Sequence, residues 1–171
     1  MVPMILNVKL CPTEGDLLED VSAYRRLNGG LFYLTIFFPD ITYVVHKLSQ
    51  YVSKPRKPHL DIVHHLLKYL KAFPGQGLLF SISFSLKIQT FSDADWGSFL
   101  NIRRSITGFC IFLGDSWISW RDKKQITVSR SSAEAEYKAL ASTASEVMWL
   151  HQLLIDLKVS PITLALLFCD N

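Results

Sequence analysis

The sequence predicts an α/β chain in which three short helices precede the order β-β-β-α-β. Residues 22–73 repeat apolar side chains every three to four positions, which is typical of amphipathic helices. From Gly77 the pattern changes to short runs rich in Phe, Ile and Ser, which favour strands. A long amphipathic stretch after Ser131 and an apolar run over 162–169 complete the order.

The first part of the chain is expected to be helical. Apolar stripes over 24–38 and 41–52 predict two helices, and Pro58 suits the first turn of a third. Residues 1–21 show no period and are expected to be extended. The predicted organisation is a lead-in over 1–21, a helical connection segment over 22–76 and an α/β domain over 77–171 that is incomplete at its C-terminus.

Strands and one long helix are expected in the second part. The predicted strands cover 78–84, 86–91, 106–113, 117–120, 125–128 and 162–169. The last of these is apolar except for Thr163, which predicts a central strand buried on both faces. The helix is expected to turn one stripe toward the sheet, made of Tyr137, Leu140, Ala141, Ala144, Val147, Met148 and Leu154.

Bulk composition leaves several function classes open. The chain has 171 residues, 49% of them apolar, which suffices for a core, and a net charge of +3. Three basic clusters stand out: Lys54-Pro55-Arg56-Lys57, Arg103-Arg104, and the stretch from Arg121 to Arg130. Each alone fits a solvated face, but three clusters flanking the carboxylate-bearing strands favour contact with a phosphate backbone.

Cysteine and histidine spacing argues against zinc and disulfides. Cys11, Cys110 and Cys169 are odd in number and far apart, which predicts buried free thiols in a reducing, intracellular compartment. His64 and His65 are adjacent, so on a helix they point about 100° apart and do not predict a metal site. No apolar run approaches the roughly twenty residues of a membrane span, and no basic leader precedes the first apolar residues, so no membrane partner is expected.

Two neighbouring aspartates compete for a role at the end of the 86–91 run. Asp93 and Asp95 are two residues apart on an extended chain, so they share a face and either could reach a metal ion. Asp95 lies nearer an expected turn at 96–98, where Asp often bonds to the local backbone. Asp93 is therefore favoured as the ligand.

Two glutamates compete at the start of the long helix. Glu134 and Glu136 lie about 200° apart around the axis, so only one can face the sheet. Glu134 stands three residues after Ser131, the spacing of a capping box, which predicts a structural role. Glu136 adjoins Tyr137 of the expected core stripe and is favoured as the ligand.

Asp170 follows the last apolar run. An Asp-Asn pair after a strand is ordinary turn chemistry, but the C-terminal end of a buried strand is also where open α/β sheets assemble their sites. Asp93, Glu136 and Asp170 together would repel one another unless a cation neutralised them. Oxygen ligands of this kind suit Mg²⁺ or Mn²⁺, and paired ions held this way catalyse phosphodiester hydrolysis.

Several motifs in order resemble one known family. They are Phe91-Ser92-Asp93-Ala94-Asp95-Trp96, Arg103-Arg104-Ser105-Ile106-Thr107-Gly108-Phe109, Trp117-Ile118-Ser119-Trp120, Ser129-Arg130-Ser131-Ser132-Ala133-Glu134-Ala135-Glu136-Tyr137 and Phe168-Cys169-Asp170-Asn171. This pattern resembles the ribonuclease H domain of copia-type retrotransposon Pol polyproteins. Upstream, Tyr24-Arg25-Arg26-Leu27, Tyr33-Leu34-Thr35, Pro39-Asp40-Ile41 and Leu66-Leu67-Lys68-Tyr69-Leu70-Lys71 resemble the segment that connects the reverse transcriptase to that domain.

The resemblance implies a fold and an activity. The fold is a ribonuclease H-like mixed sheet whose first three strands are antiparallel and whose fourth is parallel to the first. Asp93, Glu136 and Asp170 match the residues that carry two Mg²⁺ or Mn²⁺ ions in the family. The implied reaction is hydrolysis of RNA in an RNA–DNA hybrid, recognised by duplex shape. The implied partners are that hybrid and the reverse transcriptase portion of a parent polyprotein.

The sequence departs from the family pattern in two places. The family continues beyond the Asp-Asn pair with helices and a fourth metal-binding carboxylate, whereas this chain ends at Asn171. The expected activity is therefore weak or absent, and the alternative is a non-catalytic remnant that binds nucleic acid. Phe37-Phe38 also replaces a basic residue that the family often has before Pro39-Asp40.

Overall fold

The computed structural model describes residues 2–4, 10–82, 85–99, 102–159 and 164–169. The chain divides into two compact units, Met1–Gly77 and Leu78–Asn171, which are described separately. In chain order the elements are α1 (Val21–Leu34), the 3₁₀ helix η1 (Pro39–Ile41), α2 (Thr42–Ser49), α3 (Lys57–Ala72), β1 (Ile88–Phe99), β2 (Arg104–Leu113), β3 (Ser116–Lys124), α4 (Ser132–Asp156) and β4 (Leu166–Cys169).

The first unit contains the three helices that the apolar stripes predicted. Helix α1 begins at Val21 because Asp20 caps it, its side chain accepting a hydrogen bond of 2.8 Å from the amide of Ala23. Helix α3 has Pro58 in its first turn, as predicted. The short η1 turn at Pro39 separates α1 from α2.

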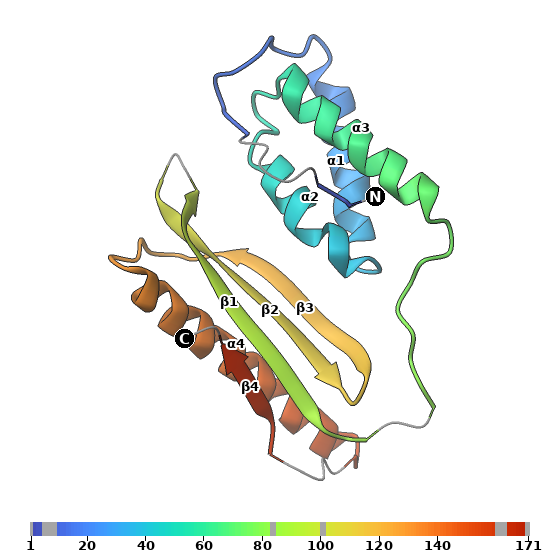
Figure 1. The fold of residues 1–171 in the computed structure, drawn as a ribbon, viewed down its shortest axis with the longest axis vertical. Helices are drawn as coiled ribbons and strands as arrows, with labels where there is room; N and C mark the ends of the chain where they lie inside the picture. Colours follow the sequence, from blue (N-terminus) through green and yellow to red (C-terminus); the bar gives the residue numbers. More distant parts are fainter. Residues whose placement is uncertain (1, 5–9, 83–84, 100–101, 160–163, 170–171) are drawn as a thin grey trace. The chain divides into compact units, whose positions relative to one another are not determined.

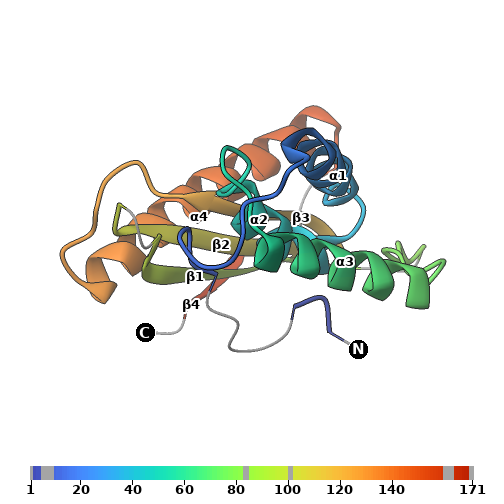
Figure 2. The same cartoon turned by 90° about the horizontal axis from the view of Figure 1, so that it is seen from above.

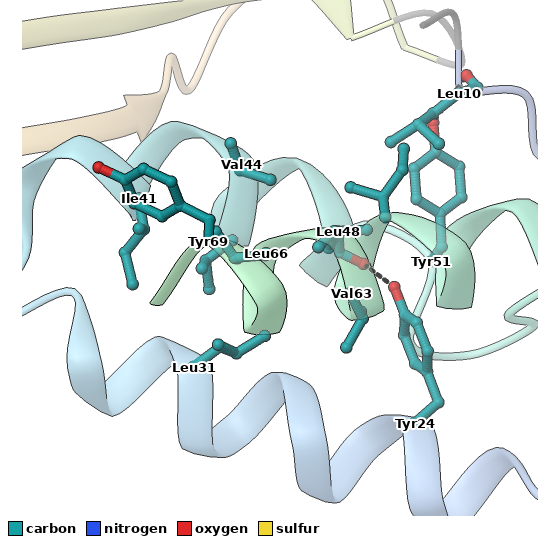
Figure 3. Packing of buried hydrophobic residues seen from close by; sticks show 12 residues of the cluster. Leu10, Tyr24, Leu31, Ile41, Val44, Leu48, Tyr51, Val63, Leu66 and Tyr69 are labelled. Atoms are coloured by element: carbon teal, nitrogen blue, oxygen red, sulfur yellow. Dashed lines mark hydrogen bonds between the residues drawn. The ribbon is translucent and has the colours of Figure 1, made fainter. Parts of the chain in front are cut away.

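Apolar side chains from all three helices form the core of this unit. Figure 3 shows Leu31, Val44, Leu48, Val63 and Leu66 converging between the helices. Tyr24 is completely buried, and its hydroxyl donates a hydrogen bond of 2.9 Å to the carbonyl oxygen of Leu48. This bond satisfies a polar group that burial would otherwise leave without a partner.

The second unit is built on a four-stranded mixed sheet with the order β3-β2-β1-β4 (Figure 1). Strands β1, β2 and β3 are antiparallel neighbours, and β4 runs parallel to β1. Helix α4 contacts β1 and β2 and lies across one face of the sheet (Figures 1 and 2). The α/β class is confirmed, and the arrangement is compatible with a ribonuclease H-like fold.

The position of β4 differs from the prediction. Within the described residues β4 pairs with β1 alone and lies at the edge of the sheet. Leu166 and Phe168 are 40% and 42% exposed. The apolar run therefore did not predict burial on both faces correctly. Whether a strand is central depends on which strands pair with it, and the apolar run carries no information on that pairing.

Two other strands have different bounds from those predicted. Strand β1 begins at Ile88 and continues through Asp93 to Phe99, so the aspartate lies inside the strand; the stretch 78–82 is not a strand, and 83–84 lie outside the described residues. Strand β3 continues to Lys124 through its charged residues, and 125–128 are not a strand. Charged residues are tolerated in β3 because it is an edge strand of the described sheet.

Helix α4 begins after Ser131 as predicted, and Val147 and Leu154 of the predicted stripe pack against the core of the sheet, but the most buried residues of the helix lie outside that stripe. Its buried residues are Ala135, Ala139, Thr143 and Leu150. Tyr137 and Met148, which the apolar pattern placed in the core, are 71% and 73% exposed. Small side chains line the contact because they let the helix axis approach the strands closely, which a hydrophobicity pattern does not reveal.

The three cysteines form no disulfide, as predicted, but they are not fully buried. Cys11 and Cys110 are half-buried and Cys169 is exposed. Across the part of the chain that the structure describes, every helix is too short or too polar to cross a membrane.

Candidate active site

Two of the predicted carboxylates meet at one backbone amide. The N–H of Ala94 donates to Oδ1 of Asp93 at 2.8 Å and to Oε1 of Glu136 at 3.2 Å. Glu136 is 42 positions from Ala94 in the sequence, so the fold brings a distant carboxylate to the nitrogen that Asp93 also contacts. Asp93 is exposed, whereas Oε2 of Glu136 is buried. The carboxylates therefore lie where the sheet surface meets the start of α4.

A layer of alanines makes this meeting possible. Ala94 of β1 is 8% exposed, and Ala135 and Ala139 of α4 are completely buried against it. One turn further along the helix, Oγ1 of Thr143 and Oγ of Ser92 lie 2.9 Å apart in a buried hydrogen bond. Methyl side chains and this hydroxyl pair hold α4 close to β1, so that the short side chain of Glu136 reaches the strand.

The neighbouring Glu134 has the capping role that its spacing predicts. Its amide donates to Oγ of Ser131 at 3.2 Å, and its Oε2 accepts 2.8 Å from the amide of Arg130, one residue before the N-cap. Its Oε1 also lies 2.7 Å from Nζ of Lys138. The Lys138 ammonium, followed by the Arg130 amide, lowers the pKa of Glu134. Glu134 thus stabilises the helix start while Glu136 turns toward β1.

Asp95 shares a strand face with Asp93, as its spacing predicts, and it is exposed. The turn expected at 96–98 is instead an irregularity within β1, where Gly97 has a φ of +62° and the pairing with β2 shifts register. The carbonyl of Asp95 accepts a hydrogen bond of 3.2 Å from Oγ of Ser98. Asp93, however, is the aspartate that shares an amide with Glu136.

The third predicted ligand, Asp170, lies outside the described residues. Its neighbour Cys169 is the register partner of Ser92, and Ser92 immediately precedes Asp93. In the described ranges no three His, Cys, Asp or Glu side chains are grouped closely enough to hold a metal ion. The structure thus brings together two of the three predicted ligands, Asp93 and Glu136.

A buried polar network next to the site was not found from the sequence. Nε2 of Gln125 donates to Oγ1 of Thr107 at 3.1 Å and to the carbonyl of Ala135 at 2.9 Å. Its Oε1 accepts a hydrogen bond of 3.0 Å from Oγ of Ser129. The indole N–H of Trp96 reaches the Ser129 carbonyl at 3.0 Å. The network attaches the loop before α4 to the sheet. Its one signal in the sequence is the alternation of Gln125, Thr127 and Ser129 with apolar residues directly after the charged residues 121–124.

The basic clusters have different roles in the structure. Arg56 belongs to the helical unit, and its guanidinium binds backbone carbonyls of Pro12 and Gly15. Lys123 and Lys124, in contrast, are exposed at the end of β3. With Lys138 they line a pocket of about 400 Å³ between the sheet and α4. A cation-rich surface of the sheet unit therefore lies at the end of β3, and the exposed Arg103 and half-buried Arg104 lie at the start of β2.

The sheet, the helix and the carboxylate pair define an α/β protein compatible with the ribonuclease H-like class. No family model and no solved structure matches the chain. A Pol polyprotein from transposon RE1 of Arabidopsis thaliana is 38% identical over 169 residues, covering 99% of this chain and 12% of the polyprotein. The Pol polyprotein from transposon TNT 1-94 of Nicotiana tabacum is 32% identical over 155 residues, 89% of this chain and 12% of its own length.

A third relative is matched over most of its own length. The secreted RxLR effector protein 161 of Plasmopara viticola is 38% identical over 128 residues, 74% of this chain and 90% of that protein. The chain belongs to the family of copia-type retrotransposon Pol polyproteins and their relatives. It corresponds to one segment of the two polyproteins and spans about 12% of their length.

Proposed function

We propose that the sheet unit is a ribonuclease H-like nuclease module that hydrolyses RNA in an RNA–DNA hybrid. The observation that carries the proposal is the shared amide of Ala94, which holds Asp93 and Glu136 side by side. We include Asp170 as the third ligand on the basis of the family motif. The similarity to Pol polyproteins supports a further proposal, that the module works with the reverse transcriptase portion of such a polyprotein.

The residues present fit a divalent cation. Two carboxylates at one N–H repel each other, and a cation between them would offset that repulsion. Both donors are hard oxygens, which suit Mg²⁺ or Mn²⁺ better than zinc. Ions bound there would activate the attacking water and stabilise the leaving oxygen.

The chain's own residues orient this site. Ala135 and Ala139 set the spacing between helix and strand, and the Ser92–Thr143 bond fixes the helix along the strand. Glu136 is thereby held in place before any ligand binds, which lowers the cost of assembling the site. Exposed cationic side chains at the end of β3 would bind phosphates irrespective of base sequence.

Cleavage of a labelled RNA–DNA hybrid tests the proposal directly. We expect cutting that depends on Mg²⁺ or Mn²⁺ and that Asp93→Asn abolishes. Asp95→Asn is the matched control, because it removes the same charge two residues away on the same exposed face. Its cleavage rate should stay within a few-fold of the unmodified chain.

Metal binding can be followed separately through the thermal stabilisation that Mn²⁺ confers on the folded chain. The stabilisation should be lost in Asp93→Asn and kept in Asp95→Asn. If the folded chain binds hybrid in a salt-sensitive manner without cutting it, and Asp93→Asn binds equally well, the non-catalytic alternative is correct. Equal cutting by both aspartate variants would refute the assignment of Asp93.

A further inference from the structure

The segment 10–18 of the helical unit is attached to the start of α3 by backbone hydrogen bonds. The amide of Lys57 donates to the carbonyl of Asp16 at 2.9 Å, and the amide of Leu18 donates to the carbonyl of Pro55 at 3.1 Å. We call residues 10–18 the N-terminal strap. It has no helix or strand of its own beyond an isolated bridge between Leu17 and Arg56. These bonds hold its second half, while Leu10 at its start is buried in the helical core and accepts a hydrogen bond of 3.0 Å from the Tyr51 hydroxyl.

His59 is at the centre of the attachment. It is completely buried, and its ring stacks on Tyr51 with centroids 4.0 Å apart and planes inclined by 19°. Its Nδ1 accepts a hydrogen bond of 3.0 Å from the amide of Arg56, and its Nε2 lies 3.2 Å from the carbonyl oxygen of Cys11. A backbone N–H can only donate and a carbonyl can only accept. The ring is therefore neutral, with its proton on Nε2, and it bonds the strap to α3.

Protonation is incompatible with this arrangement. A second proton would sit on Nδ1 and face the amide of Arg56, so that two donors would oppose each other. The Arg56 side chain adds a positive charge close by, since its Nε and Nη1 donate to the carbonyls of Pro12 and Gly15 at 2.8 and 2.5 Å. Those two bonds also attach the strap, so Arg56 and His59 at the start of α3 both hold it.

We propose that His59 is an acid-sensitive latch that secures the N-terminal strap when neutral and releases it when protonated. The titratable or charged groups that face the ring are Arg56 at the helix start and Tyr51 after α2, whereas Cys11 of the strap meets the ring through its backbone carbonyl. Tyr51 stays protonated, because burial raises its pKa. His59 is therefore the group of the latch whose charge changes in the mildly acidic range.

The direction of the pH effect follows from the environment of the ring. Burial lowers the pKa of His59 below its usual 6.5, Arg56 lowers it further, and the bond to Cys11 opposes the change. The released ring binds a proton more readily than the latched ring. The stability of the latch is therefore complete above about pH 6.5 and declines as the pH falls below that value. One proton is coupled, so opening increases by at most about tenfold per pH unit.

Hydrogen exchange at the Leu18 amide measures the opening of the strap in the full chain. After correction for intrinsic exchange rates, opening should rise between about pH 6.5 and about pH 5 in the unmodified chain. In His59→Gln the rise should disappear, because Gln does not titrate in this range. His64→Gln is the matched control: His64 is exposed on the same helix, and its variant should keep the rise.

Imidazole nitrogen resonances of the unmodified chain give a second measurement that does not depend on how the variants fold. They should show His59 as the neutral Nε2–H form at neutral pH, with a pKa below the usual 6.5. Opening that is independent of pH, or that rises equally in His59→Gln, would overturn the proposal. So would a doubly protonated His59 ring in a chain whose Leu18 amide remains protected.

Discussion

Replacing Gln125 by Leu should destabilise the sheet unit by about 3 kcal/mol. Gln125 is 8% exposed and makes three buried hydrogen bonds, to Thr107, Ala135 and Ser129. Each bond contributes about 1 kcal/mol net to the free energy of unfolding. In the Leu variant the buried polar groups of Thr107, Ala135 and Ser129 lose their partner, and this cost outweighs any gain from the added apolar contact. Leu has a similar volume, so a cavity contributes little to the effect.

Tryptophan fluorescence in urea is the appropriate assay. The chain has four tryptophans, Trp96, Trp117, Trp120 and Trp149, and all lie in the sheet unit. The fluorescence transition therefore reports the unfolding of that unit and not of the helical one. The free energy of unfolding follows from the midpoint and the slope of the transition.

Gln152→Leu is the matched control, because Gln152 is exposed on α4 and bonds to Asp156 of the same helix. Its free energy of unfolding should change by no more than about 0.5 kcal/mol. If Gln125→Leu lost no more stability than this control, the network would not be what holds the loop before α4 to the sheet. The position of Glu136 would then be explained by the alanine layer and the Ser92–Thr143 bond without the Gln125 network.

Two further predictions concern other parts of the chain. Tyr24→Phe removes the buried hydrogen bond to Leu48 and should destabilise the helical unit by about 1 kcal/mol. Tyr33→Phe, at an exposed position, should leave its stability unchanged. Amide exchange within α1–α3 measures the stability of both variants. Because the pKa of Glu134 is lowered in the folded chain, its carboxylate stabilises the start of α4 above about pH 4.5, and this contribution fades as the pH falls further. Glu134→Gln should thus flatten the dependence of the tryptophan transition on pH below that value, and parallel profiles would contradict the reasoning.

The elements could be predicted where local chemistry determines them. Ser131 begins a helix through its side chain, and Pro58 suits a first turn through its fixed φ, so those starts were predicted from the sequence. The cap of α1 at Asp20 was not predicted, because the apolar stripe begins only at Tyr24. The edge position of β4 could not be predicted, because strand order depends on pairing between distant segments. The continuation of β3 through Arg121–Lys124 was missed for a related reason: an edge strand tolerates charge that a central strand would not.

The candidate site was predicted in part. Choosing Glu136 over Glu134 is consistent with the structure, but the argument through Tyr137 was wrong, since that side chain is exposed. The contact is made by alanines, which carry little weight in an apolar pattern. Gln125 was missed because a buried amide looks like an ordinary loop residue until its three partners are assembled around it. The metal-binding roles of Asp93, Glu136 and Asp170 stay predictions.

The alanine layer has a consequence for how copies of a mobile element lose function. A larger side chain at Ala135 or Ala139 pushes α4 away from β1, at a cost of about 1–3 kcal/mol that a folded domain can absorb. A displacement of about an ångström is enough to disturb a catalytic site. If the sheet unit is the nuclease proposed above, substitutions in this layer would therefore silence a copy while leaving its fold intact. Among related copies, the volume of the side chains at Ala94, Ala135 and Ala139 should distinguish competent sites from folded but silent ones, even where both acidic residues are retained.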